Sequence, residues 1–257
     1  MSHTQELTAN KLKVKIYDTR LEMGTRAAAD VIAAIQALLR QQDNVNMIFA
    51  AAPSQNEFLK TLSEEKSLSW NRVNAFHMDE YIGLPKEAPQ SFGHFLKERL
   101  FAKLPFRQVF YINGNATDPQ QECSRYSDLL KQYPADIVCM GIGENGHIAF
   151  NDPHVADFND PALVKIIDLS EASRQQQVHD GCFATIEEVP VAAITLTIPA
   201  LVNTSAVYCM VPGSTKARAV YHTLRSEIKE QYPSTILRKH GNATLYLDKD
   251  SASELKP

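Results

Sequence analysis

One segment of this chain gathers several side chains that could move protons. The run from Ile137 to Pro153, IVCMGIGENGHIAFNDP, begins with apolar residues and then breaks into glycines. It places His147 two residues after Asn145 and five residues before Asp152. Histidine titrates near neutral pH, and a carboxylate partner can fix its tautomer. The segment therefore predicts an acid–base loop that follows a buried strand.

Two adjacent carboxylates form a second cluster. Asp79 and Glu80 follow an apolar run in the sequence FHMDEYIGLP. Burying a carboxylate is costly unless it has a partner or a task. One of the two could act as a general base while the other orients a neighbour. A solvated loop pair is the alternative that these residues alone leave open.

Two further clusters could hold an anion. Ser54, Gln55 and Asn56 lie between a predicted strand and its helix, where free amides attract negative charge. A simple N-cap role for Ser54 is the alternative. Lys216, in PGSTKARA, falls in the first predicted turn of a helix, where its charge opposes the helix dipole. A bound phosphate would account for this position, and a lysine extended into water is the alternative.

Alternation of short apolar runs with helical patterns predicts the elements that bring these clusters together. The predicted strands are Val14–Tyr17, Val45–Ala51, Arg72–His77, Val109–Ile112, Ile137–Met140, Ala192–Leu196, Ala206–Val211 and Thr244–Leu247. Predicted helices cover Leu21–Leu39, about 54–62 and about 91–103, and others begin at Asp118 and near Ser214. This order favours an α/β fold with three α/β/α layers around a mainly parallel, Rossmann-like sheet. Ligands bind beyond the carboxyl ends of such strands, where all four clusters fall.

Composition narrows the class of protein. The 257 residues are 44% hydrophobic, which suits one domain spanning 1–257, and the polar residues 1–10 are expected to be flexible. A net charge of -4 without a basic run argues against nucleic acid and membrane surfaces as partners. Four cysteines without C-x-x-C spacing fit a reducing compartment and no zinc site. We expect a cytoplasmic protein without a signal peptide or a membrane span. The sequence leaves open whether the protein forms a homo-oligomer.

Three motifs in order resemble one enzyme family over nearly the whole chain. FHMDEYIGLP followed by PQSF, then GIGENGHIAFNDP, then PGSTKARA are similar to the glucosamine-6-phosphate deaminases. The resemblance implies an aldose–ketose isomerisation with loss of ammonia, without metal or cofactor. Glucosamine 6-phosphate and water would give fructose 6-phosphate and ammonia, so the partner is a small phosphosugar. The 6-phosphogluconolactonases share the fold and a similar glycine–histidine loop, but not usually the MDEYxGLP run.

The resemblance also implies roles for individual residues. Asp79 would move a proton between C2 and C1 of the open-chain sugar. His147 would assist ring opening at O5, with Asn145 and Asp152 as its catalytic neighbours. The implied substrate-binding residues are Ser54, Gln55, Asn56, Glu80, Gly143, Arg174 and Lys216.

Three departures from the family pattern keep other functions open. Ser54-Gln55-Asn56 stands where many members carry Gly-Gly-Thr, and Asn145 where an aspartate is common. Asp152 replaces the usual glutamate and is one methylene shorter. The alternatives are a 6-phosphosugar lactonase, an isomerase for a different sugar phosphate, and a catalytically impaired sugar-phosphate-binding protein.

Overall fold

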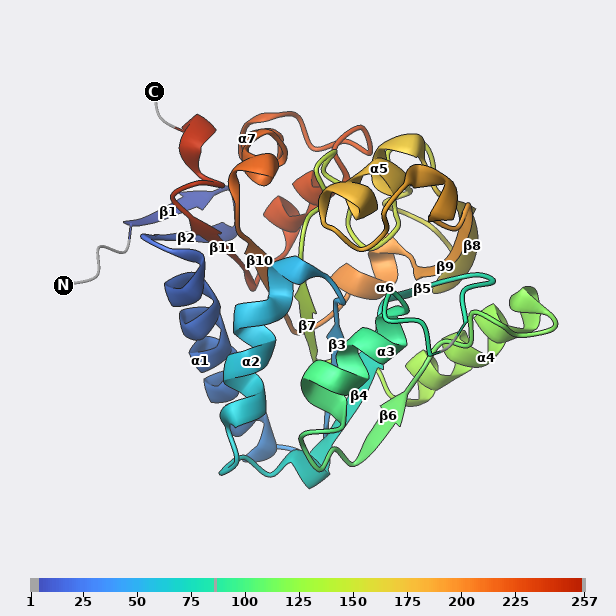
Figure 1. Ribbon diagram of the computed structural model, residues 1–257. Helices are drawn as coiled ribbons and strands as arrows, with labels where there is room; N and C mark the ends of the chain where they lie inside the picture. The colour runs from blue at the N-terminus through green and yellow to red at the C-terminus, as the bar shows by residue number, and fades with distance from the viewer. Residues whose placement is uncertain (1–4, 86, 256–257) are drawn as a thin grey trace.

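A mainly parallel sheet forms the centre of the fold in the computed structural model, which describes residues 5–85 and 87–255 (Figure 1). Over these residues the sheet has eight strands in the order β1-β2-β11-β10-β7-β3-β4-β6. Its strand pairs are parallel, apart from the β1–β2 hairpin. The strands are β1 (Gln5–Ala9), β2 (Leu12–Tyr17), β3 (Val45–Phe49), β4 (Val73–His77), β6 (Gln108–Phe110), β7 (Ile137–Met140), β10 (Ala206–Val211) and β11 (Ala243–Asp248).

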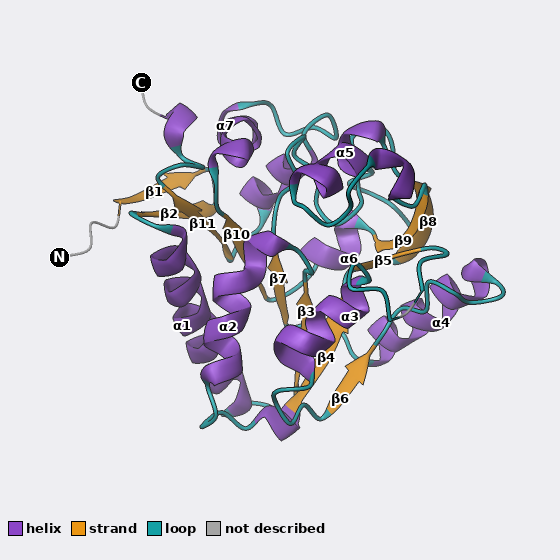
Figure 2. Ribbon diagram, viewed as in Figure 1, coloured by secondary structure: helices purple, strands orange, loops and turns teal. Residues whose placement is uncertain are grey.

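Helices cover both faces of this sheet, which confirms the predicted three-layer α/β/α class (Figure 2). One face carries α1 (Arg20–Leu39), α2 (Asn56–Glu64) and α3 (Phe92–Leu96), the last continued by a π-helical turn over Lys97–Phe101. The other face carries α4 (Pro119–Gln132), α6 (Ile198–Val202) and α7 (Ala217–Arg225). Asp118 caps α4 by accepting from the amides of Gln120 and Gln121, and Pro119 takes the first helical position, as expected.

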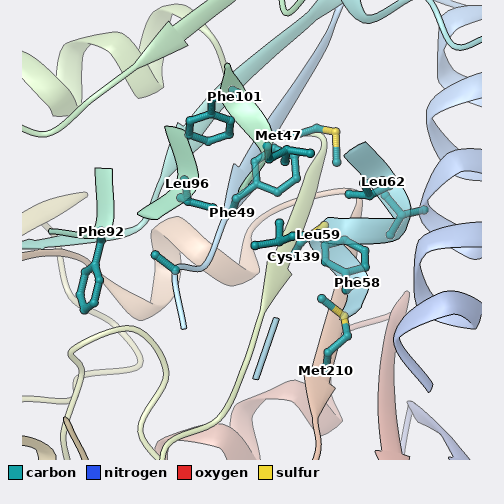
Figure 3. Packing of buried hydrophobic residues seen from close by; sticks show 14 of the residues in the cluster. Met47, Phe49, Phe58, Leu59, Leu62, Phe92, Leu96, Phe101, Cys139 and Met210 are labelled. Atoms are coloured by element: carbon teal, nitrogen blue, oxygen red, sulfur yellow. The ribbon is translucent and has the colours of Figure 1, made fainter. Parts of the chain in front are cut away.

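Alternation along the central strands divides the hydrophobic core into two layers. Phe49 and Cys139 face the layer of α1, α2 and α3, where they pack with Phe58, as Figure 3 shows. The neighbouring residues Ile48 and Val138 point into the opposite layer. All five side chains are essentially buried, as a parallel sheet covered on both faces requires.

A second, antiparallel sheet lies beside the first and was not predicted. It consists of β5 (Asp79–Tyr81), β9 (Ala192–Leu196) and β8 (Val164–Asp168), in that order. The expected loop carboxylates are therefore part of a strand, and Ala192–Leu196 does not join the parallel sheet. Helix α5 (Glu171–His179), also unpredicted, follows β8.

The amino-terminal segment corrects another expectation. Residues 5–9, predicted to be flexible, pair with β2 across a tight turn in which Asn10 has a φ of 55°. The alternation in QELTA is weak, so the pairing partner rather than the sequence pattern defines this edge strand. The first four residues lie outside the described range. No helix in the described ranges is long and apolar enough to cross a membrane.

Candidate active site

A narrow pocket lies at the carboxyl ends of β3, β7 and β10, with β5 and α5 beside it. Its cavity volume is about 70 Å³. The polar residues that line it are Ser54, Asp79, His147, Gln176, Gln177, Asp180 and Lys216, with Gly141 and Gly143 in its wall. The structure thus brings together one residue or more from each of the four predicted clusters.

His147 is held from its Nδ1 side. That nitrogen lies 2.8 Å from Oδ1 of Asn145 and 3.2 Å from Oδ1 of Asp152. The Asn145 amide nitrogen donates to the same Asp152 oxygen at 2.8 Å, so the amide oxygen must accept. Nδ1 therefore carries the proton in neutral His147. Nε2, on the other side of the ring, then carries the lone pair and faces the pocket.

Asp152 is a fully buried carboxylate with hydrogen-bond donors around it. Burial alone would raise its pKa, but hydrogen bonds and charge from His147, with hydrogen bonds from Asn145 and Ser173, hold the pKa well below its ordinary value. It therefore stays ionised at neutral pH. One methylene shorter than glutamate, it still reaches the histidine.

The pKa of Asp79 is shifted in the opposite direction to that of Asp152. The residue is only 7% exposed, and burial together with the charge of Glu80 raises the pKa of its carboxyl group well above the ordinary value. Its backbone carbonyl accepts from Nδ1 of His77 at 2.9 Å, while Nε2 of that ring accepts from the amide of Ile112. Burial lowers the pKa of His77, which fits this neutral tautomer. Asp79 is thus a pocket carboxylate with the raised pKa that suits a general base.

The glycines of the loop at residues 141–152 have different structural roles. Gly146 has a φ of 87°, a left-handed conformation that glycine adopts without strain. Gly143 instead gives space to the histidine, because a Cβ there would lie 2.1 Å from Cε1 of His147. Ala149, in the same loop, also has a positive φ of 49°. Such a non-glycine conformation is uncommon and is often found at functional sites.

Lys216 lies in a short 3-10 turn just before α7, and it is 5% exposed. Burial lowers the pKa of its ammonium, and the nearby carboxylates of Asp180 and Glu144 offset part of this effect. Among the described residues, none forms a hydrogen bond or an ion pair with this ammonium. The burial of Lys216 excludes the alternative of a lysine extended into water, and a buried cation in this state favours an anionic ligand.

The Ser54–Asn56 run contributes one residue to the pocket. Ser54 lines it and caps neither the 3-10 turn at Pro53–Gln55 nor α2. Gln55 is 1% exposed, and its amide nitrogen donates to Ser54 Oγ and to the Met210 carbonyl. Asn56 accepts from Arg99 at 3.1 Å and does not line the pocket.

Glu80 and Arg174 face away from the pocket and serve the fold. The Glu80 carboxylate accepts from the amides of Tyr81, Phe92 and Gly93 and from the Ser91 hydroxyl, and so stabilises the start of α3. Arg174 donates to the carbonyls of Ile186 and Val189 and thereby holds the next loop. The structure does not bring either residue into contact with the pocket.

Helix α5 supplies pocket residues that the sequence did not reveal. Gln176, Gln177 and Asp180 line the cavity, and Ser173 contacts the pair of Asp152 and His147. The run of amide side chains in SRQQQVHDGC could have indicated polar pocket residues. The helix itself was not predicted, because its sequence lacks a clear apolar stripe. These residues close one wall of the site.

Acid–base chemistry on a polar anionic molecule suits this arrangement. A neutral imidazole can accept a proton at Nε2, a buried carboxylate can exchange one nearby, and a lysine can bind a negative group. Among the described residues no group of three His, Cys, Asp or Glu side chains is placed to hold a metal ion. The fold and the pocket define an α/β protein with an acid–base site suited to a small anionic molecule.

Comparison with known proteins identifies the family. Residues 18–246 match the model of glucosamine-6-phosphate isomerases and 6-phosphogluconolactonases. A glucosamine-6-phosphate deaminase of Bacillus cereus strain B4264 is 36% identical over 219 residues, covering 85% of this chain and 81% of the relative. A deaminase of strain G9842 is 34% identical over 244 residues, covering 95% and 88%. The chain belongs to the family of glucosamine-6-phosphate isomerases and 6-phosphogluconolactonases.

Solved structures agree with this assignment. A monomeric glucosamine-6-phosphate deaminase superposes with a TM-score of 0.85 at 28% identity, covering 93% of this chain and 98% of that protein. A 6-phosphogluconolactonase of Thermotoga maritima gives a TM-score of 0.76 at 20% identity, covering 92% and 99%. The second likeness shows the shared fold alone.

Proposed function

We propose that this protein is a glucosamine-6-phosphate deaminase, which converts glucosamine 6-phosphate and water to fructose 6-phosphate and ammonia. The observation that carries the proposal is that Asp79, His147 and Lys216 line one pocket. They supply a carboxylate with a raised pKa, an imidazole held at its Nδ1 side and a buried cation. The deaminase relatives at 34–36% identity support the same activity.

His147 begins the proposed reaction by opening the sugar ring. Because Nδ1 holds the proton toward Asn145 and Asp152, Nε2 can accept the proton of the anomeric hydroxyl. It can then return a proton to the ring oxygen O5. Asp152 remains ionised and stabilises the imidazolium formed between these two transfers.

Asp79 performs the proton transfer that comes after ring opening. Its carboxylate removes the proton from C2 and delivers it to C1, while O1 gains a proton and the amino nitrogen loses one. The C1=O double bond of the aldehyde is thereby replaced by a C=N double bond, which leaves an alcohol at C1 and an imine at C2. Water then adds to the imine carbon, and the C2–N bond breaks with release of ammonia. A lactone hydrolysis requires no proton transfer between carbon atoms, so the buried Asp79 favours the deaminase over the lactonase alternative.

The pH dependence of the reaction should follow Asp79. A base must be ionised to act, and both burial and Glu80 raise the pKa of Asp79. We expect kcat/KM to fall with decreasing pH well above the ordinary carboxyl pKa of about 4. A pH–rate profile measures this, with the phosphate pKa of the substrate determined by ³¹P NMR as the control. Activity that stays constant down to pH about 4 would argue against Asp79.

Lys216 should bind the phosphate of the substrate. Its replacement should therefore lower the activity but raise the stability of the protein. Lys216→Met should lower kcat/KM for glucosamine 6-phosphate about 10- to 100-fold, the worth of one charge-assisted hydrogen bond. The same change should raise the free energy of unfolding by about 1 kcal/mol, because it removes a buried cation without a partner. Steady-state kinetics and urea unfolding measure the two effects.

Two controls separate phosphate binding from general damage. Lys131→Met removes a lysine whose side chain is 66% exposed, and it should change neither quantity. Any residual turnover of unphosphorylated glucosamine should be unaffected by Lys216→Met. Equal losses on the two sugars would mean that Lys216 does not recognise the phosphate.

We further propose that one chain suffices for activity and that it works in the cytoplasm. A monomeric glucosamine-6-phosphate deaminase is among the similar solved structures, which supports the first point. The four cysteines are unpaired, which is the usual state in a reducing compartment. Gel filtration of the active enzyme tests the first point, and cell fractionation tests the second.

A further inference from the structure

Ser173 contacts the two residues that set the state of the histidine. Its side chain comes from α5, and the residue is 1% exposed. Its Oγ lies 2.6 Å from Oδ1 of Asp152 and 3.1 Å from Nδ1 of His147. This hydroxyl therefore joins the loop at residues 141–152 to a different element of the fold.

The directions of these hydrogen bonds follow from the chemistry of the groups. Ionised Asp152 can only accept, so the Ser173 hydroxyl must donate its proton to Oδ1. Its lone pairs then remain to share the Nδ1–H of His147, whose shorter contact is with Oδ1 of Asn145. The serine hydroxyl thus connects the imidazole of His147 to the carboxylate of Asp152 through two hydrogen bonds. Loss of its hydroxyl would remove one donor from Asp152 and one of the acceptors around Nδ1–H of His147, inside a buried network.

Ser173 is also well placed to limit motion of the loop. The glycines Gly141, Gly143 and Gly146 leave this loop little intrinsic stiffness. Helix α5 is capped at its start by Ser170, whose Oγ accepts from the amide of Ser173 at 3.1 Å. A second tie, from the amide of Glu144 to Oε1 of Gln176 at 2.8 Å, joins the same helix to the loop.

We propose that Ser173 is a positioning residue that orients His147, so that Nε2 faces the substrate during ring opening. The proposal rests on the deaminase function proposed above. Ser173 touches no reacting atom, and it acts through Asp152 and His147. Helix α5 thereby contributes a residue to the hydrogen-bond network of His147, as well as residues that line the pocket.

Substitutions at this position separate the hydroxyl from the space that it fills. Ser173→Cys keeps the volume with a weak hydrogen-bonding group, and Ser173→Thr keeps the hydroxyl. We expect Ser173→Ala and Ser173→Cys to lower kcat about 10-fold with KM within about twofold, a loss that corresponds to one hydrogen bond to a charged group. Ser173→Thr should retain kcat within about threefold of the wild type. If Ser173→Ala does not fold, the Cys and Thr pair decides the matter.

Ser170→Ala is the matched control, because it removes a cap from the same helix but no side-chain contact with His147. We expect it to destabilise the protein while kcat stays within about twofold. A loss of kcat in Ser170→Ala as large as in Ser173→Ala would overturn the proposal, since helix docking alone would then explain the effect. Unchanged kcat in both Ser173→Ala and Ser173→Cys would overturn it as well.

A spectroscopic measurement keeps this test independent of the substrate. The Nδ1–H proton of His147 should give a slowly exchanging downfield ¹H resonance in the wild type, assigned by its absence in His147→Gln. Ser173→Ala should broaden this signal through faster exchange with water, and Ser170→Ala should not. An inactive wild type would refute the deaminase function, whereas an unaltered resonance in Ser173→Ala would refute the role of Ser173.

Discussion

Replacing Asp79 by asparagine should reduce kcat about 10²-fold or more, because an amide cannot take a proton from C2 of the sugar. The substitution preserves the shape of the side chain and the backbone carbonyl that accepts from His77. KM should therefore change little. Measuring fructose 6-phosphate production under saturating substrate tests this expectation. Activity within about threefold of the wild type would refute Asp79 as the base.

The same substitution should make the protein more stable at neutral pH. The folded-state pKa of Asp79 is raised, so its contribution to stability is complete below about pH 4 and is lost as the pH rises through the raised pKa. Asp79→Asn removes this loss of stability at neutral pH. The difference in the free energy of unfolding between the variant and the wild type should disappear near pH 4. Asp128→Asn, at a side chain that is 74% exposed, is the control and should show neither effect. Urea unfolding at several pH values measures the difference.

Gly143→Ala should reduce kcat/KM about 10²-fold, because the new methyl group would occupy the space of the histidine ring. Its Cβ would lie 2.1 Å from Cε1 of His147 and 2.3 Å from each ring nitrogen. The ring must move or the loop must shift, and either change displaces Nε2 from the sugar. The Gly143 amide also donates to the His147 carbonyl at 2.9 Å, so backbone adjustment would break a contact of the loop.

Gly241→Ala provides the comparison for this prediction. A Cβ at Gly241 would have no heavy atom within 4 Å, and its φ is not positive. It should leave kcat/KM and the melting temperature close to the wild-type values. A Gly143→Ala enzyme with nearly full activity would mean that His147 does not need its present position for turnover.

Much of the fold and part of the pocket could be predicted from the sequence. The apolar runs of β3, β7 and β10 are unambiguous because these strands are buried on both faces. A parallel sheet brings the loops after its strands to one edge, so the positions of Ser54, His147 and Lys216 could be inferred from topology. Asn145 and Asp152 were recognisable because short spacing makes their contact with the histidine a local property.

The remaining features depend on contacts between distant segments. Nothing near Glu80 indicates that its carboxylate binds the start of α3, because Ser91 and Gly93 come more than ten residues later. The strand β5 has only three residues, and its pairing with β9 crosses more than one hundred positions. Ser173 contacts Asp152 from a helix without an apolar stripe. Local patterns cannot specify such partners.

The most direct test of the proposed function is to incubate the purified protein with glucosamine 6-phosphate and to measure ammonia and fructose 6-phosphate together. We predict that the two products form in equal amounts and that Asp79→Asn nearly abolishes both. In a parallel reaction, 6-phosphogluconolactone should not be hydrolysed faster than in buffer. Absence of ammonia from a folded sample, or rapid lactone hydrolysis without deamination, would contradict the assignment.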